Sequence, residues 1–538
     1  MPEKKIWQKE TFLILILIGI CLILFFFRLG DGPLGDIDEA MHASTSKDMV
    51  LSGDWVTPQY NGQNFYDKPP FYNWLAAISF LFFGFTEFAA RLPAALSGLG
   101  CVMITYWLGR RMFGPVAAFL SALVLATSAE YLVLSRVVVH DISLVFFDTL
   151  ALTLFYVGYT DERHRKPAFL SGYAALGFAV LAKGPVGLAL PVMIIGLFLV
   201  CKKQLRFISE MQIGWGLLIF IAVASPWYIL VGLRNPDYTE YFFLKQNIGS
   251  FLSQQSRHPK PFYYYIPVLM GGLFPWSLFL PLAVFRAFRK RSAENGDGLV
   301  FALIWFGVVF IFFSMASSKL GTYILPLFPA ASLLVGVLWY DLLYAPNRVL
   351  HKGVFYSYLP FAVIVPLALF YVLLFPASLP QIDAAINLQP VYLIAIWVVG
   401  CALISMGLIA KRRYRTFIAS IAGMVATLFL LLLIYIVPLL GPLVSEKELA
   451  FKLDKLTPPE ENIRFYLKDR ASFLFYTDRK AEVLENQPQL IAYMASAKKV
   501  FCIFKYDDWE DVANLHGTMH IVAKVGDKLI VSNTKAGL

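Results

Sequence analysis

Long apolar runs separated by short polar turns make up most of the chain. A helix needs roughly 17–25 mainly apolar residues to cross a hydrocarbon core of about 30 Å. About thirteen runs approach that length, namely 11–27, 89–109, 115–134, 141–159, 168–182, 185–201, 213–233, 264–285, 299–315, 322–343, 354–375, 391–410 and 416–437. The pattern predicts a polytopic α-helical membrane protein.

One apolar run, Phe71–Phe85, is ambiguous because it is short and follows Pro69-Pro70. It is either a further span or a helix on the membrane surface. If it does not cross, every basic cluster falls on one side, which the positive-inside rule makes cytoplasmic. If it crosses, most clusters move to the face opposite the N-terminus. We therefore expect a surface helix, a cytoplasmic N-terminus and a periplasmic C-terminus. The clusters are Lys4/Lys5/Lys9, Arg110-Arg111, Arg163/Arg165/Lys166, Lys202-Lys203/Arg206, Arg286/Arg289/Lys290/Arg291, Arg348/Lys352 and Lys411/Arg412/Arg413/Arg415.

The C-terminal part has a different pattern, typical of a soluble domain. A helical stretch, Glu446–Leu456, precedes the strand-like stretches "IRFYL", "SFLFYT" and "AEVLE". A helix near 487–497, the strand "VFCIFKY", a short helix at Asp507–Leu515 and a hairpin turning at Gly526-Asp527 complete it. We therefore expect a transmembrane domain, 1–440, with periplasmic loops at 28–88 and 234–263, and a small periplasmic α/β domain, 441–538.

Composition agrees with a membrane protein. Of 538 residues, 58% are hydrophobic and 15% charged, whereas soluble domains average about 25% charged residues. Mean hydropathy is +0.64. The formal net charge of +10 is explained by the cytoplasmic clusters, so we do not expect nucleic-acid binding. The N-terminal segment has no small-x-small cleavage site before the acidic stretch, so we interpret it as an uncleaved first span and not as a signal peptide.

The five cysteines lie far apart and form no CxxC pair. That spacing predicts neither a disulfide framework nor a zinc knuckle.

Two acidic residues follow the first span closely, Asp38 and Glu39 in "GDIDEAMH". Ionisable groups at a membrane edge are costly unless a site uses them. Such a carboxylate can orient or deprotonate an acceptor, or stabilise positive charge that develops at a sugar carbon. The alternative is a solvated loop carboxylate, and Asp36 fits that alternative better.

Three lysines and a further aspartate are also expected on the outer face. Lys68 in "FYDKPP" suits a lipid phosphate, although a snorkelling lysine looks the same. Lys183 lies in the turn "LAKGP". Lys319 and Tyr323, four residues apart in "SSKLGTYILPLFP", are expected on one helical face. Asp141 begins a span, where a helix N-cap explains it equally well.

The outer loop 234–263 is too long to be a mere connection. It combines aromatic residues with Lys245, Arg257, His258 and Lys260. It either covers a cavity or lies in the aromatic belt of the membrane interface.

Several motifs together resemble membrane glycosyltransferases that use polyprenyl-phosphate sugars. They are the "DE" after the first span, "SGDWVTPQYNG", "YDKPP", "LAKGP", "KPFYYYIPVL…FPWS", "SKLGTYILPLFP" and "VGDKLIVSN". The chain is most similar to the family of the 4-amino-4-deoxy-L-arabinose lipid A transferase, and more distantly to protein O-mannosyltransferases. The resemblance implies a GT-C fold with thirteen spans, periplasmic surface helices and an α/β periplasmic domain.

The resemblance also implies roles for individual residues. The family's catalytic aspartate falls on Asp38, with Glu39 beside it, and the second acidic residue falls on Asp141. The phosphate-binding lysine falls on Lys68, and further polar contacts fall on Lys183 and Tyr323; Lys319 joins them as a donor-binding candidate by its outer position. The implied reaction transfers a sugar, with inversion, from an undecaprenyl-phosphate carrier to lipid A or a related envelope glycolipid, at the periplasmic face of the bacterial inner membrane.

The chain departs from the family at several positions. His42 replaces a tyrosine, Asn247 and Ser250 stand where a histidine and an arginine are expected, and Asp67 replaces a glutamate. Asp67 and His258 are weak candidates for a divalent metal site, and we assign no metal ligand.

Two other functions stay open. A protein hydroxyl as acceptor, as in O-mannosylation, requires Asp38 to act as a general base. A lipid-linked substrate transporter would carry charges near the bilayer midplane and repeated halves, but here charges gather at one edge and no repeat is apparent. We favour the glycolipid acceptor because the tail is similar to that of the arabinose family.

Overall fold

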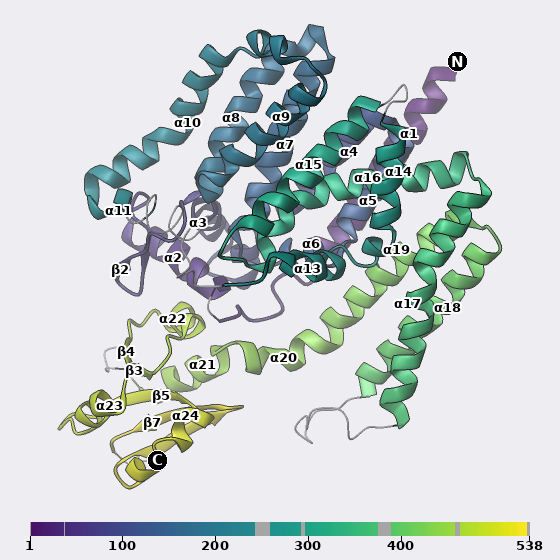
Figure 1. Cartoon of the computed structure of the whole chain (residues 1–538). Helices are drawn as coiled ribbons and strands as arrows, with labels where there is room; N and C mark the ends of the chain where they lie inside the picture. The colour runs from purple at the N-terminus through teal and green to yellow at the C-terminus, as the bar shows by residue number, and fades with distance from the viewer. Residues whose placement is uncertain are drawn as a thin grey trace. The chain divides into compact units, whose positions relative to one another are not determined.

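The structure is a computed structural model that describes residues 2–36, 38–240, 242, 259–291, 296–374, 389–457 and 463–534. The chain folds into two compact units (Figure 1). The helical unit comprises Met1–Phe27, Tyr66–Tyr72 and Ala94–Tyr435. The loop-and-tail unit comprises Arg28–Phe65, Asn73–Pro93 and Ile436–Leu538.

The helical unit is built from long helices joined by short turns. Its elements are α1 (Pro2–Cys21), η1 (Leu22–Phe26), most of α4 (Glu87–Phe113), α5 (Pro115–Ala126), α6 (Ala129–Leu134), α7 (His140–Thr160), η2 (Glu162–His164), α8 (Arg165–Lys183), α9 (Val186–Cys201), η3 (Leu205–Glu210), α10 (Ile213–Arg234), α11 (Asp237–Thr239), η5 (Phe262–Tyr264), α13 (Tyr265–Gly272), η6 (Trp276–Phe279), α14 (Leu280–Lys290), α15 (Gly296–Met315), η7 (Gly321–Leu327), α16 (Phe328–Tyr344), α17 (Arg348–Leu374), α18 (Gln389–Ala410), α19 (Tyr414–Leu431) and η9 (Leu432–Ile436).

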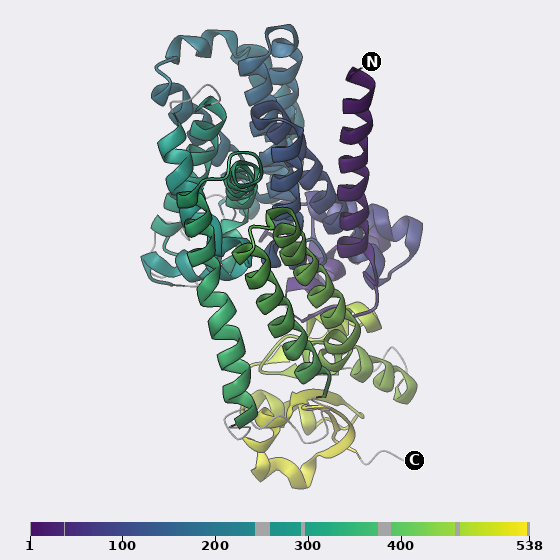
Figure 2. The ribbon, with the colours of Figure 1, turned by 90° about the vertical axis from the view of Figure 1, so that its right-hand side faces the viewer.

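Burial divides these helices into an interior and an exterior set. Of an 18-residue apolar stretch in each helix, 72% is buried in α7 and 78% in η7 with α16. The same share is only 17% in α17 and in α18. Helices α17, α18 and α19 lie next to one another, as the green ribbons of Figure 2 show. Side chains such as Trp215 and Leu218 of α10 are apolar and exposed, as expected of a surface that faces lipid.

Each of the thirteen runs predicted to span coincides with a helix or a broken helix. Among the described residues, eight helices are long and apolar enough to cross a membrane, or nine if the bent pair Phe262–Gly272 and Trp276–Lys290 is one span. The remaining runs fall on Glu10–Phe26, Pro115–Ala126, Val186–Cys201 and α8. The polytopic helical fold is therefore confirmed. The ambiguous run forms the short helix α3 (Phe71–Phe83), which at about 1.5 Å per residue is too short to cross alone.

The loop-and-tail unit joins part of the loop after the first helix to the C-terminal part of the chain. The loop contributes α2 (Asp38–Ser52), the small hairpin of β1 (Gln59–Tyr60) and β2 (Gln63–Asn64), most of α3 and the start of α4. The tail contributes α20 (Val437–Val444) and the α/β domain. The domain prediction placed the whole loop 28–88 with the transmembrane part, whereas here most of it packs with the tail.

The tail domain is a five-stranded mixed sheet in the order β4-β3-β5-β7-β6. β3 (Ile463–Tyr466) pairs in parallel with β4 (Glu482–Leu484) and β5 (Phe501–Lys505), and β7 (Lys528–Ser532) pairs antiparallel with β5 and with β6 (His520–Val525). Helices α21 (Lys447–Leu456), α22 (Ala471–Thr477), α23 (Gln487–Met494) and α24 (Tyr506–Glu510), with η10 (Ala513–Thr518), complete it.

Successive apolar side chains of β5 point to opposite faces of the sheet, and both faces are buried. Phe501 and Ile503 pack into one apolar cluster with Phe473 and Leu449, whereas Cys502 packs into the other with Trp509 and its neighbours. The α/β class predicted for the tail is therefore confirmed. One element was wrong: "SFLFYT" forms helix α22 and not a strand, because a short apolar run buried almost throughout has no periodicity that separates the two.

Candidate active site

In the helical unit, three residues predicted for the site lie together. Asp141 is in the first turn of α7 and Lys183 is the last residue of α8. Their side chains form an ion pair, and they are 8% and 9% exposed, respectively. The Lys183 Nζ also lies 4.3 Å from the centre of the Tyr323 ring, contributed by η7. A buried ammonium group therefore has a carboxylate and an aromatic face as partners.

The turn after α8 explains where Lys183 lies. Gly184 has φ +84°, a conformation that side-chain-bearing residues rarely adopt, and Pro185 follows it. The helix therefore ends at Lys183, where a cation is favourable near the C-terminus of the helix dipole. Asp141 has the complementary position at a helix N-terminus, where an anion is favourable.

Lys68 lies in a segment held against the same two helices. Its neighbour Phe71 packs edge-on against Phe147 of α7, with ring centres 5.1 Å apart, and against Phe178 of α8 at 5.7 Å. Tyr72 packs against His140, directly before Asp141, at 5.3 Å. Ring contacts thus tie the segment that carries Lys68 to the helices that carry Asp141 and Lys183.

Lys319 does not share a helical face with Tyr323, and that prediction was wrong. α15 ends at Met315, residues 316–320 are not helical, and the 3₁₀ helix η7 starts at Gly321, so the spacing of four carries no helical meaning. Lys319 is 4% exposed. Its ammonium group donates to the carbonyl of Ala316 and, at 3.2 Å, to that of Lys260, so in this structure it ties two loops together.

Asp38 and Glu39 begin helix α2 in the loop-and-tail unit. The Asp38 side chain is exposed. Glu39 is engaged: its Oε1 accepts from Arg91 Nε at 2.7 Å, and its Oε2 accepts from Arg91 Nη2 at 3.0 Å and from the Gly35 amide at 2.8 Å. These contacts favour a positioning role for Glu39, whose catalytic role stays a prediction.

The structure describes only one of the two metal-ligand candidates, Asp67, so the pair with His258 stays untested among the described residues. That part of the chain holds no group of three or more His, Cys, Asp or Glu side chains able to bind a metal ion. Asp67 is half-buried. His258 lies outside the described residues, as do Asn247, Ser250, Lys245 and Arg257.

The sequence interpretation missed three ionisable residues inside apolar runs. Arg91 is 7% exposed at the start of α4, and Asp148 is 2% exposed in α7. Glu130 of α6 packs closely against Gly272: a Cβ added to Gly272 would lie 2.1 Å from the Glu130 Oε2 atom. An ionisable residue within a predicted span is itself a signal of a functional site, so all three could have been found.

Comparisons with known proteins agree with this architecture. The family described as dolichyl-phosphate-mannose-protein mannosyltransferase matches residues 67–230. An undecaprenyl phosphate-alpha-4-amino-4-deoxy-L-arabinose arabinosyl transferase of Edwardsiella ictaluri is 33% identical over 306 residues, covering 56% of this chain and 54% of that protein. The chain thus spans about half the length of this curated relative. An uncharacterized protein of Aquifex aeolicus is 32% identical, and the match covers 61% of this chain and 73% of that protein.

The fold matches a solved structure over nearly its whole length. The crystal structure of ArnT from Cupriavidus metallidurans bound to undecaprenyl phosphate has a TM-score of 0.80 and 24% identity, covering 97% of this chain and 98% of that one. An archaeal oligosaccharyltransferase, AglB from Archaeoglobus fulgidus, matches with a TM-score of 0.51 and 14% identity, over 93% of this chain and 69% of that one. The fold therefore defines a multi-pass membrane protein of the GT-C class. Within that class, the chain belongs to the same family as the Aquifex aeolicus protein, and it is similar to the 4-amino-4-deoxy-L-arabinose arabinosyl transferases over about half of their length.

Proposed function

We propose that the protein is an inverting glycosyltransferase that moves a sugar from an undecaprenyl-phosphate-linked donor to lipid A or a related envelope glycolipid. The reaction takes place at the periplasmic face of the bacterial inner membrane. The names of the arabinosyl transferase relatives support the donor class, and the ArnT structure of the same fold was solved with undecaprenyl phosphate bound.

The buried cluster of Asp141, Lys183 and Tyr323 is the observation that carries this proposal. An ammonium group has three N–H donors and no acceptor. Lys183 is held at a helix end by one carboxylate and one ring, so a phosphate that approaches Lys183 gains a preorganised cation. Such electrostatic stabilisation is strong where water is excluded.

The proposed reaction forms one bond and breaks another. An acceptor oxygen forms a bond to the anomeric carbon while the bond from that carbon to the carrier phosphate oxygen breaks. The bonding electron pair leaves with the carrier, whose phosphate gains a negative charge that Lys183 and Lys68 stabilise. The role proposed for Asp38 is to take a proton from a hydroxyl acceptor, or to orient a phosphate acceptor that has no proton to lose.

A protein hydroxyl is the second candidate acceptor, favoured by the mannosyltransferase description that matches residues 67–230. The two acceptors differ in their need for a base. Since a Ser or Thr hydroxyl must lose its proton, Asp38→Asn would abolish transfer to a peptide more completely than transfer to a glycolipid phosphate.

Purified protein with labelled undecaprenyl-phosphate sugars, offered lipid A or a Ser/Thr peptide, tests the proposal. We expect product on the glycolipid, and we expect Asp38→Asn and Lys68→Ala to lose at least about a hundredfold in rate. Asp31→Asn, an exposed aspartate of the same outer loop, is the matched control and should stay active. Full activity of Asp38→Asn and Lys68→Ala would contradict the assignment of these residues to the site. Label on the peptide alone would show that the acceptor is a protein hydroxyl and not a glycolipid.

A further inference from the structure

We infer that the C-terminal tail positions Asp38, through hydrogen bonds from its residues to the loop segment just before α2. Asp36 and Tyr476 are then positioning residues that touch neither donor nor acceptor. This inference rests on the proposed catalytic role of Asp38, and it gives the tail a function beyond covering the site.

Tail residues hold the segment Leu34–Asp36 at three points. The Asp36 amide donates to the carbonyl of Val444 at 2.8 Å. The Ser472 amide, at the start of α22, donates to Asp36 Oδ1 at 2.7 Å. The Leu34 amide donates to the Tyr476 hydroxyl at 2.8 Å. Each contact joins positions more than 400 residues apart in sequence, so only the folded tail can supply them.

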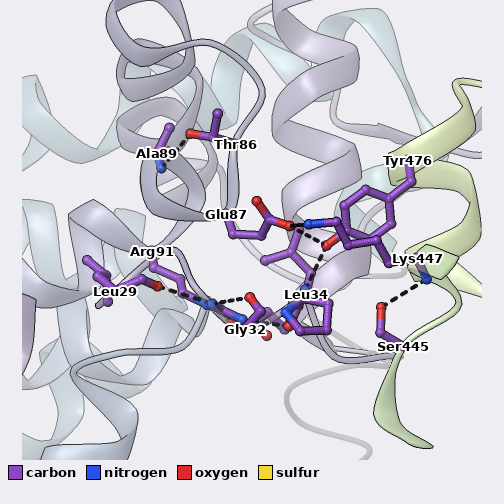
Figure 3. A network of polar contacts seen from close by, with 12 residues as sticks. Leu29, Gly32, Leu34, Thr86, Glu87, Ala89, Arg91, Ser445, Lys447 and Tyr476 are labelled. Carbon is purple, nitrogen blue, oxygen red and sulfur yellow. Dashed lines mark hydrogen bonds and ion pairs between the residues drawn. The ribbon is translucent and has the colours of Figure 1, made fainter. Parts of the chain in front are cut away.

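The Tyr476 hydroxyl is fixed on both sides, as Figure 3 shows. It accepts from the Leu34 amide and donates to Glu87 Oε1 at 3.0 Å. The same Glu87 oxygen pairs with the Lys447 ammonium group of α21. Since both hydrogen-bonding directions of the hydroxyl are used, its removal frees Leu34 and leaves Glu87 with one partner fewer.

Arg91 binds residues that come before and after the segment Leu34–Asp36 (Figure 3). Its guanidinium group makes five hydrogen bonds, to the carbonyls of Leu29, Gly32 and Pro33 and to both carboxylate oxygens of Glu39. A guanidinium group has five N–H donors, so all of them are used. The carbonyls before Leu34 and the carboxylate after Asp38 are therefore held by one rigid side chain.

These contacts surround Asp38 in the sequence. Asp36 is fixed by the tail, Glu39 is fixed by Arg91, and the Ala40 amide donates to the Gly35 carbonyl at 3.0 Å. The backbone at Asp38 thus begins α2 between two fixed residues, while its side chain stays exposed. A reacting group needs placement to within a fraction of an ångström, and a displacement of about 1 Å can cost about a hundredfold in rate.

Kinetics of the full-length protein test this inference with labelled undecaprenyl-phosphate sugar as donor. Tyr476→Phe and Asp36→Ala should lower kcat about tenfold to a hundredfold with the donor KM unchanged. Asp36→Asn keeps an oxygen that accepts from Ser472 and should recover most of the rate. Tyr493→Phe is the matched control, because its hydroxyl donates within the tail to Phe501.

A double variant separates positioning from a loss of folding. If Tyr476 acts through Asp38, Tyr476→Phe should lower the rate strongly in the native protein and not at all in the Asp38→Asn protein. Wild-type kcat in Tyr476→Phe, or an equal further loss in the Asp38→Asn protein, overturns the inference. An active Asp38→Asn protein overturns instead the proposed function of Asp38, so the two failures are distinguishable.

Discussion

At the scale of single residues, the pair of Asp141 and Lys183 combines stability with function. Two buried ions pay a desolvation cost that their attraction only partly offsets, and removal of one partner leaves the other charge buried and uncompensated. Asp148, on the same helix, is also buried. Lys183 is then the charge on which both the local electrostatics and the proposed phosphate contact depend.

Lys183→Met should therefore destabilise the protein and abolish transfer, while Asp141→Asn with Lys183→Met should recover stability without activity. Breaking a buried pair costs about 3–5 kcal/mol, and replacing both partners is nearly neutral. Thermal unfolding in detergent and transfer assays on the native protein and these two variants check this. Transfer by Lys183→Met at the native rate would contradict the assignment.

Asp48 of α2 makes the stability of the loop-and-tail unit depend on pH. Burial raises the pKa of its carboxyl group from 3.8 to about 6, with Asp478 adding to the rise and Lys480 and Lys47 opposing it. Because the folded state binds this proton more tightly, Asp48 lowers stability increasingly as the pH rises from about 4 to about 6, and fully above that.

Asp48→Asn should accordingly stabilise the protein at pH 8 and have little effect at pH 4. We expect a gain of the order of 1 kcal/mol, well below the full shift, since the group is partly exposed and screened by water. The difference in unfolding temperature between variant and native protein, measured at both pH values, checks the sign. A larger gain at pH 4 than at pH 8 would be the wrong sign.

At the scale of elements, the end of α8 decides where Lys183 lies. Gly184→Ala places a Cβ at a residue with φ +84°, which costs about 1–2 kcal/mol, so the turn should shift and transfer should fall about tenfold or more. Gly196→Ala is the control, because Gly196 lies within α9 with no atom within 4 Å of the added Cβ. If the two variants were equally active, the conformation of this turn would not determine the transfer rate.

The elements themselves could largely be predicted from the sequence, because apolar periodicity and charge placement determine helices in a membrane. α3, the hairpin of β6 and β7, and the positions of Asp141 and Lys183 at helix ends all follow from local signals. The helix α22 and the non-helical segment 316–320 could not be predicted, since tertiary packing and not local pattern sets them.

The positioning network around Asp38 lies beyond local sequence for a related reason. Asp36 resembles a solvated loop residue, and nothing near Tyr476 in sequence points to Leu34. Such contacts between distant segments leave no periodic signal, whereas the lone Arg91 in an apolar run did leave one.

At the scale of the whole molecule, sidedness connects the fold to the proposed reaction. The basic clusters predict that Ser209, in the turn after α9, is cytoplasmic and that Ala497, in the tail, is periplasmic. Both residues are exposed, so cysteines introduced there should react with a thiol reagent. Cys201 is exposed and Cys401 half-buried, and both are first replaced by serine in a variant that retains transfer activity.

A membrane-impermeant maleimide applied to spheroplasts should label Ala497→Cys at once and Ser209→Cys only after permeabilisation. The donor carries its sugar on a lipid phosphate, so the tail, the loop of Asp38 and the donor headgroup must all reach the same aqueous face. Reversed labelling would put the tail on the cytoplasmic side, and Asp38 with it, because the tail is hydrogen-bonded to the segment Leu34–Asp36 within the loop-and-tail unit. The periplasmic reaction would then be excluded, while the hydrogen bonds from the tail to the Asp36 segment would still hold.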